Sequence, residues 1–152
     1  MKKKISLLLI CILVCFQLVG CGSKGSITAD VFANSAENHG YVISYLDEQY
    51  SAYPHIKSVI VAQKDGYQIE FFVLSSEDNA KSIYQTNAML FDESKDGNYV
   101  ETSSSGKNYN TYKVKDADEI MYVSRIDNTV FYARVNKAYE VEVSEIINLL
   151  GY

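Results

Sequence analysis

Two runs rich in β-branched and aromatic residues flank the dipeptide Asp65-Gly66 in the stretch IKSVIVAQKDGYQIEFFVL. An Asp-Gly pair is favoured in a two-residue hairpin turn because both residues accept a positive φ. A second stretch, EIMYVSRIDNTVFYARV, has the same form and turns at Asp127-Asn128. These two stretches predict antiparallel hairpins, and they are the strongest constraint that the sequence places on the fold.

Three other segments carry apolar residues at three- and four-residue spacing, which predicts amphipathic helices. They cover residues 28–40, 75–97 and 136–151, and each ends near a glycine, which is typical of a helix C-terminus. Residues 41–46 predict a further strand, and residues 98–115 predict two polar strands around a turn at residues 103–106. The expected fold is a single α+β domain with a mostly antiparallel sheet. About three helices should pack on one face, because each has only one apolar stripe to bury.

Residues 57–92 and residues 119–150 share a common plan, a hairpin followed by an amphipathic helix. Two interpretations fit this pattern. The stretches are either a diverged internal repeat or a chance recurrence of a common unit, and we favour the second interpretation.

The first twenty residues have a different character. Three lysines precede the sixteen-residue stretch ISLLLICILVCFQLVG, in which only Ser6 and Gln17 are polar. This stretch is shorter than the roughly 18 to 20 apolar residues that a membrane-spanning helix needs. A basic start, a short apolar stretch and small residues before a boundary are typical of a secretory signal peptide. We therefore expect residues 1–20 to be a signal peptide.

Residues 18–21, Leu-Val-Gly-Cys, resemble the lipobox of bacterial lipoproteins, in which a small residue precedes an invariable cysteine. The resemblance implies cleavage before Cys21 and a diacylglycerol on its sulfur, with fatty chains such as palmitate holding the protein at the membrane. The remaining chain is similar to small uncharacterised lipoproteins of Gram-positive-type bacteria, a likeness that supplies no functional residue beyond Cys21. The alternative interpretation is an ordinary signal peptide, or a tethering helix, with a chance cysteine.

Processing of this kind would leave a lipidated cysteine and flexible linker over residues 21–27, followed by a globular domain over residues 28–152. Cys11 and Cys15 would be removed, so the mature domain would have no disulfide and no thiol chemistry. Three of the 14 Lys and Arg residues precede Cys21, whereas all 19 Asp and Glu residues follow it, which gives a mature charge of about −8. The sequence thus lacks the basic patch of a nucleic-acid-binding protein.

No catalytic motif, cofactor site or metal site is predicted. His39 and His55 do not have the spacing of metal ligands. The acidic stretch KDADE, with Asp116, Asp118 and Glu119, matches only the first two ligand positions of a calcium-binding loop. A solvated turn is favoured over a weak surface cation site.

Tyrosine is unusually frequent, with 13 residues and no tryptophan. Its ordinary role is to pack on a half-exposed sheet face, where the ring is buried and the hydroxyl stays wet. Exposed tyrosines also form platforms for sugars, peptides or proteins, because aromatic side chains dominate such contacts. Tyr99, Tyr109 and Tyr112 lie in the polar strands of residues 98–115, which we expect to be the most exposed part of the sheet. They are the candidate ligand-binding residues.

These observations favour a non-enzymatic binding or interaction module, anchored to the cell membrane through Cys21 on the extracytoplasmic face. The expected ligand is an envelope protein or glycan. One alternative is a small envelope hydrolase using carboxylates, which would need a concave pocket with two acids at working distance. The other is an accessory subunit of a membrane complex.

Overall fold

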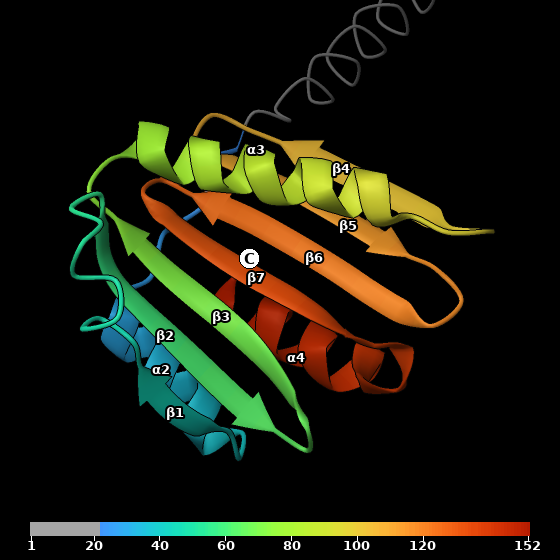
Figure 1. The fold of residues 1–152 in the computed structure, drawn as a ribbon, viewed down its shortest axis with the longest axis horizontal. Coiled ribbons are helices and arrows are strands. Elements are labelled where there is room, and N and C mark those ends of the chain that lie inside the picture. The colour runs from blue at the N-terminus through green and yellow to red at the C-terminus, as the bar shows by residue number, and fades with distance from the viewer. Residues whose placement is uncertain (1–21) are drawn as a thin grey trace, which may run out of the picture.

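A computed structural model describes residues 22–152, which form a seven-stranded antiparallel sheet and three α-helices (Figure 1). The strand order is β1-β2-β3-β7-β6-β5-β4, so the two predicted hairpins lie side by side within the sheet. The elements are α2 (Ala29–Asn38), β1 (Val42–Tyr45), β2 (Ile56–Lys64), β3 (Tyr67–Leu74), α3 (Glu77–Ser94), β4 (Val100–Ser105), β5 (Tyr109–Lys115), β6 (Glu119–Ile126), β7 (Thr129–Asn136), a 3-10 turn (Lys137–Tyr139) and α4 (Glu140–Leu150). The predicted single α+β domain with an antiparallel sheet is confirmed.

Both predicted hairpin turns form, and their backbone angles agree with the turn chemistry. Asp65 and Gly66 adopt φ angles of 48° and 84°, and Asp127 adopts a φ of 49°. These values lie in the left-handed region, which glycine enters freely and aspartate enters more readily than most residues. The second turn sets the register of β6 on β7, in which Ile126 lies opposite Thr129.

The helices cover both faces of the sheet, so the prediction that they all pack on one face is wrong (Figure 1). Helices α2 and α4 cover one face and contribute Phe32 and Ile146 to its core, whereas α3 covers the other face and contributes Phe91. The reason is that the central strands are apolar on both sides. Phe71 and Phe72 are neighbours on β3 and pack on opposite faces. A sheet with two apolar faces needs cover on both.

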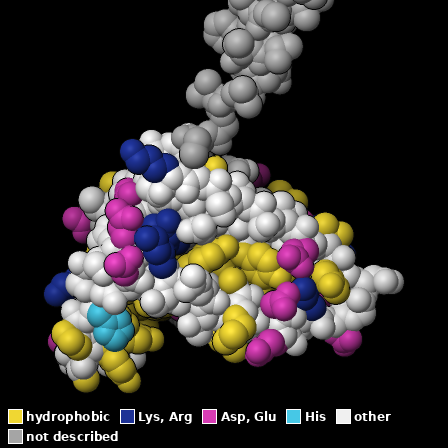
Figure 2. Space-filling view, turned by 90° about the horizontal axis from the view of Figure 1, so that it is seen from above, with side chains coloured by type: hydrophobic (Ala, Val, Ile, Leu, Met, Phe, Trp, Pro, Cys, Tyr) yellow, Lys and Arg dark blue, Asp and Glu magenta, His cyan; other side chains and the backbone are white. Residues whose placement is uncertain are grey.

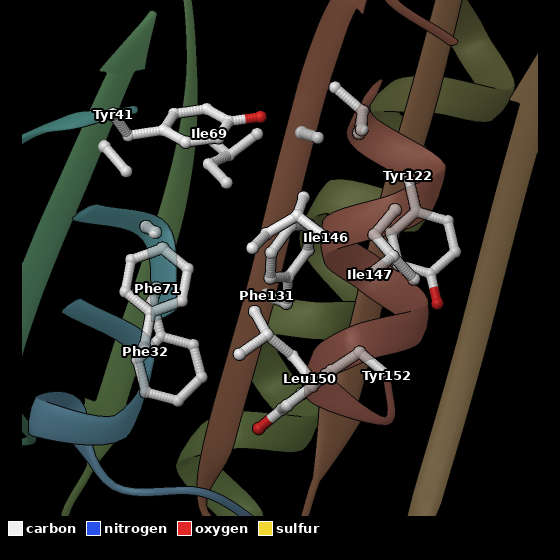
Figure 3. Packing of buried hydrophobic residues seen from close by; sticks show 14 of the residues in the cluster. Phe32, Tyr41, Ile69, Phe71, Tyr122, Phe131, Ile146, Ile147, Leu150 and Tyr152 are labelled. Carbon is white, nitrogen blue, oxygen red and sulfur yellow. The ribbon is translucent and has the colours of Figure 1, made fainter. Parts of the chain in front are cut away.

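The core beneath α2 and α4 is built around aromatic rings (Figure 3). Phe32 of α2 stacks on Phe71 of β3 with ring centroids 4.8 Å apart, and meets Phe131 of β7 edge-on at 6.1 Å. The C-terminal Tyr152 lies 5.9 Å from the Phe131 ring, and its hydroxyl is hydrogen-bonded to the Thr129 side chain. The end of the chain thereby closes this core.

Local capping residues mark three of the helix ends, whereas α4 begins at Glu140 rather than near residue 136 because residues 137–139 form a 3-10 turn. The side chains of Thr28 and Ser76 accept hydrogen bonds from backbone N–H groups in the first turns of α2 and α3. These bonds satisfy donors that a helix leaves free at its start. Gly151 follows α4 with a φ of 79°, the left-handed conformation that ends many helices.

The two hairpin-helix stretches do not form a symmetric pair. Hairpins β2–β3 and β6–β7 meet through antiparallel pairing of β3 with β7, so a two-fold rotation perpendicular to the sheet relates them approximately. Such a rotation leaves each face of the sheet in place, yet α3 and α4 lie on opposite faces. This arrangement favours the independent recurrence of a common unit over an internal repeat.

The segment before α2 lies against one end of the sheet. The N–H of Lys24 donates to Asn108 Oδ1 at 3.0 Å, and Asn108 Nδ2 donates to the Lys24 carbonyl at 2.8 Å. Ile27 packs against the core under α2 and α4. The sequence predicts a flexible linker over residues 21–27, but residues 22–27 make specific contacts with the domain.

Candidate functional site

The three candidate tyrosines, Tyr99, Tyr109 and Tyr112, lie in three different environments. Tyr99 is 47% exposed, and Lys95 Nζ lies 4.5 Å from its ring centroid. Tyr109 is half-buried beside the N-terminal segment, with Lys24 Nζ 5.2 Å from its ring centroid. Tyr109 packs with the core under α2 and α4, whereas Tyr112 packs on the opposite face. The three rings therefore do not form one platform.

Tyr112 is a core residue rather than an exposed one. Its side chain is 8% exposed beneath α3, and its hydroxyl donates to Asp92 Oδ1 at 3.2 Å. The expectation of exposure holds for all of β4 but fails for this position, because α3 covers one face of β5. Tyr112 cannot contact a ligand unless α3 moves away.

Replacing Tyr112 with leucine is expected to lower the free energy of unfolding by about 1.5 kcal/mol, through lost ring contacts and one lost hydrogen bond. The matched variant Tyr99→Leu should change it by less than about 0.5 kcal/mol, because that ring is largely in solvent. Urea unfolding of both variants measures the difference. Equal losses would show that the two tyrosines are similarly buried, contrary to the structure.

A hollow of about 830 Å³ lies at the end of the sheet where the β2–β3 hairpin turns. Strands β2, β3 and β7 and the 3-10 turn before α4 all contribute to it. Its polar and aromatic lining combines two tyrosine rings, three carboxamides, two cations and one carboxylate, which are Tyr67, Tyr139, Gln63, Gln68, Asn136, Lys64, Arg134 and Asp65.

The two tyrosines of this hollow are held in fixed positions. The rings of Tyr67 and Tyr139 stack with centroids 4.4 Å apart, and the Tyr139 hydroxyl donates to the Asp65 carbonyl at 2.8 Å. The Tyr67 hydroxyl lies 2.7 Å from the Tyr41 hydroxyl and donates to Glu142 Oε2 at 3.0 Å. Each ring is thus fixed both by its face and by its hydroxyl. Tyr67 is only 8% exposed and supports Tyr139, the half-buried ring that a ligand in the hollow could contact.

The Tyr41 and Tyr67 hydroxyl groups stay protonated at neutral pH. Burial raises the pKa of Tyr67 far above its usual range, and its hydrogen bonds with Tyr41 and Glu142 raise it further. Burial also raises the pKa of Tyr41. The Glu142 carboxylate pairs with Lys64 at 3.5 Å. The network can therefore hold a ligand by hydrogen bonding and ring contact, and it offers no activated nucleophile.

A second hollow, of about 490 Å³, gathers acidic residues near the end of α3 and the β5–β6 turn. Asp116 accepts hydrogen bonds from the backbone N–H groups of Glu119 and Asp118, and these bonds lower its pKa. Glu119 pairs with Arg134 at 2.8 Å. A carboxyl with a lowered pKa does not suit the general acid of a glycoside hydrolase, which needs a raised one.

Metal binding and membrane crossing find no support in the described part of the chain. Within residues 22–152, no group of three or more His, Cys, Asp or Glu side chains is arranged to hold a metal ion. None of the helices in this range combines the length and apolar character that a membrane span requires. Cys21, the predicted lipidation site, lies outside the described residues.

Sequence reasoning did not identify Tyr67, Tyr139 and Glu142 as neighbours. Tyr67 is 75 positions from Glu142, and the two meet only because β3 pairs with β7 and α4 follows β7. The high tyrosine content was the one visible signal, and it did not distinguish these rings from the others.

The chain matches no protein-family model, no curated protein and no solved structure. The candidate site therefore rests on the contacts described above.

Proposed function

We propose that the protein is a lipid-anchored binding module of the cell envelope, held on the extracytoplasmic face of the membrane through Cys21. The anchor is supported by residues 18–21, whose Leu-Val-Gly-Cys sequence resembles a lipobox. Two acyl chains hold a protein stably at a bilayer, whereas a single chain binds only marginally. The described domain follows this anchor closely, since α2 begins at Ala29.

The hollow at the β2–β3 turn is the proposed ligand site, and its chemistry favours an envelope carbohydrate. One observation carries this assignment: Tyr139, stacked on the buried Tyr67, and three carboxamide side chains line the same hollow. Carboxamides both donate and accept hydrogen bonds, which suits a ligand rich in hydroxyl groups. A rigid tyrosine ring gives the apolar face of a sugar a contact surface at little entropic cost.

The charges around the hollow favour an uncharged ligand. Lys64 pairs with Glu142 at 3.5 Å, and Arg134 pairs with Glu119 at 2.8 Å. Both cations of the hollow therefore already have carboxylate partners. A neutral, hydroxyl-rich ligand would leave these pairs intact, whereas a strongly charged ligand would compete with them.

Binding of soluble cell-wall glycan fragments and neutral polysaccharides to the full chain, measured by calorimetry, tests this function. Tyr139→Leu keeps an apolar side chain at the edge of the core but removes the ring and its hydroxyl. We expect at least a tenfold loss of affinity, equivalent to about 1.4 kcal/mol. Tyr99→Leu is the matched control, because it removes an exposed tyrosine outside the hollow, and it should bind normally.

Equal binding by the Tyr139→Leu variant and the unaltered protein would remove the hollow as the ligand site. Equal loss in both leucine variants would point to a general effect on the domain, which their thermal unfolding midpoints would reveal. Absence of glycan binding would contradict the carbohydrate assignment.

A further inference from the structure

Asn108 holds the N-terminal segment, residues 22–27, against the domain, and further hydrogen bonds hold Asn108 itself in place. Besides its two hydrogen bonds with Lys24, Asn108 donates from Nδ2 to Asp127 Oδ1 at 2.9 Å. Its carbonyl also accepts the Asp127 N–H at 2.8 Å. At the other end of the segment, Ile27 packs against the core under α2 and α4. Residues 22–27 are therefore part of the folded domain.

A glycine allows this segment to approach the β4–β5 turn closely. A Cβ atom at Gly106 would lie 2.7 Å from the carbonyl oxygen of Gly22, and closer still to the Tyr109 ring. Real Cβ atoms essentially never come so close to other atoms, so the chain can pass here only because residue 106 has no side chain. Gly22 thus lies against the turn. Consecutive Cα atoms are about 3.8 Å apart, so a group on the residue before Gly22 has little reach beyond it.

The two ends of the sheet have different surroundings. The β4–β5 turn at residues 106–108 and the β6–β7 turn at residues 127–128 lie at the end that contacts the N-terminal segment. The β2–β3 turn, the β5–β6 turn and both hollows lie at the opposite end. The strands between them rise about 3.3 Å per residue, which separates the two ends by about 25 Å.

We infer that the domain stands on the membrane in one orientation, with the β4–β5 turn on the phospholipid headgroups and the carbohydrate hollow about 25 Å further out. The inference rests on the proposed lipid at Cys21. A lipid attached one residue before Gly22 cannot reach the bilayer unless the turn beside Gly22 is also close to it. The carbohydrate hollow then points away from the bilayer, toward the outer part of the cell envelope.

At the end of the sheet that faces the membrane in this orientation, two lysines lie beside the N-terminal segment, and the acidic first turn of α3, with Glu77 and Asp78, lies at the same end. Lys107 is exposed in the β4–β5 turn, Lys24 is half-exposed beside it, and Asp127 is hydrogen-bonded to Asn108. Figure 2 shows a Lys or Arg side chain beside the place where the described chain begins. The acidic hollow with Asp116 lies at the far end, away from the phosphate groups that would repel it.

Two labelling positions test the orientation in the lipidated full chain. The vesicles contain phosphatidylcholine, phosphatidylglycerol and a lipid with a nitroxide on its headgroup. The mature chain has no cysteine besides Cys21, so Ser104→Cys and Ala117→Cys each offer a single site for a fluorophore. Both positions are exposed, and they lie near opposite ends of β5. We expect the nitroxide to quench the label at residue 104 several-fold more strongly than the label at residue 117.

Mass spectrometry of residue 21 separates two kinds of failure. A chain without lipid at this residue overturns both the proposed function and the orientation. A lipidated chain in which both labels are quenched equally overturns the orientation alone and leaves the anchor in place.

Two variants test whether the contacts of the segment cause the orientation. Asn108→Ala removes the hydrogen bonds to Lys24, and Gly106→Ala places a methyl group against both the Gly22 carbonyl and the Tyr109 ring. Each should reduce the difference between the two labels, whereas the control Asn98→Ala, at an exposed position at the other end, should preserve it. A difference that survives in both variants would show that these contacts do not orient the domain.

Discussion

Phe131→Ala is expected to lower the free energy of unfolding by about 3–5 kcal/mol, the largest loss that we predict from one substitution. Phe131 is fully buried on β7, which is paired on both sides, with β3 and with β6. Its ring lies 6.0 Å from that of Tyr122 and 5.9 Å from that of Tyr152. The cavity left by alanine is therefore bounded by rings from several elements, and the sheet cannot close it by moving one strand.

Guanidinium unfolding measures this loss, and Leu149→Ala provides the control. Leu149 lies on α4, which covers the same face of the sheet, but its side chain is 56% exposed. The control should change the free energy of unfolding by less than about 0.5 kcal/mol. A loss below about 1 kcal/mol for Phe131→Ala would contradict the packing, because removing a fully buried aromatic ring leaves a cavity that costs more free energy than this.

The positions of the elements could be read from the sequence because they depend on local chemistry. Asp65-Gly66 makes a turn through its own backbone preferences, and Thr28 and Ser76 cap helices within three residues of themselves. The strand order could not be read in this way, since it depends on β3 meeting β7 rather than another strand. No local pattern specifies which edges of two hairpins pair.

The two-sided core had a signal in the sequence that the predicted one-faced arrangement did not use. In β6 every residue after Glu119 is buried. The first four of these residues, Ile-Met-Tyr-Val, form a continuous apolar run instead of alternating between apolar and polar residues. Such a run is typical of a strand covered on both faces. The expectation that Tyr112 is exposed is wrong for a related reason: no local pattern in the sequence shows that α3 covers one face of β5.

The candidate site could be predicted least. The tyrosine content pointed to aromatic contacts, but the stacked pair of Tyr67 and Tyr139 depends on tertiary structure that brings β3 beside the end of β7. The hydrogen bond to Glu142 depends on the same arrangement. Residue type alone could not separate these rings from Tyr122, which is buried on the same face of the sheet.

Arg125 has an unusual environment for a charged residue. Its side chain is 2% exposed beneath the start of α3, and its nearest carboxylate, Glu77, is 3.9 Å away. The guanidinium instead donates from Nε and Nη2 to Asn110 Oδ1, at 3.1 and 3.0 Å, and from Nη1 to the Asp127 carbonyl at 3.0 Å. Asn110 lies directly opposite Arg125 on β5. A neutral amide therefore provides most of the hydrogen bonding to a buried cation.

Asn110→Ala is expected to lower the free energy of unfolding by about 3 kcal/mol, because it removes the oxygen that accepts two hydrogen bonds from this cation. Arg125→Met should cost less than about 1 kcal/mol, since it removes the charge together with its need for partners. In the Arg125→Met background, Asn110→Ala should therefore have almost no effect. Urea unfolding of the four proteins completes a double-mutant cycle, with an expected coupling of about 2–3 kcal/mol. An equal cost of Asn110→Ala in both backgrounds would mean that Asn110 stabilises the sheet independently of the buried charge.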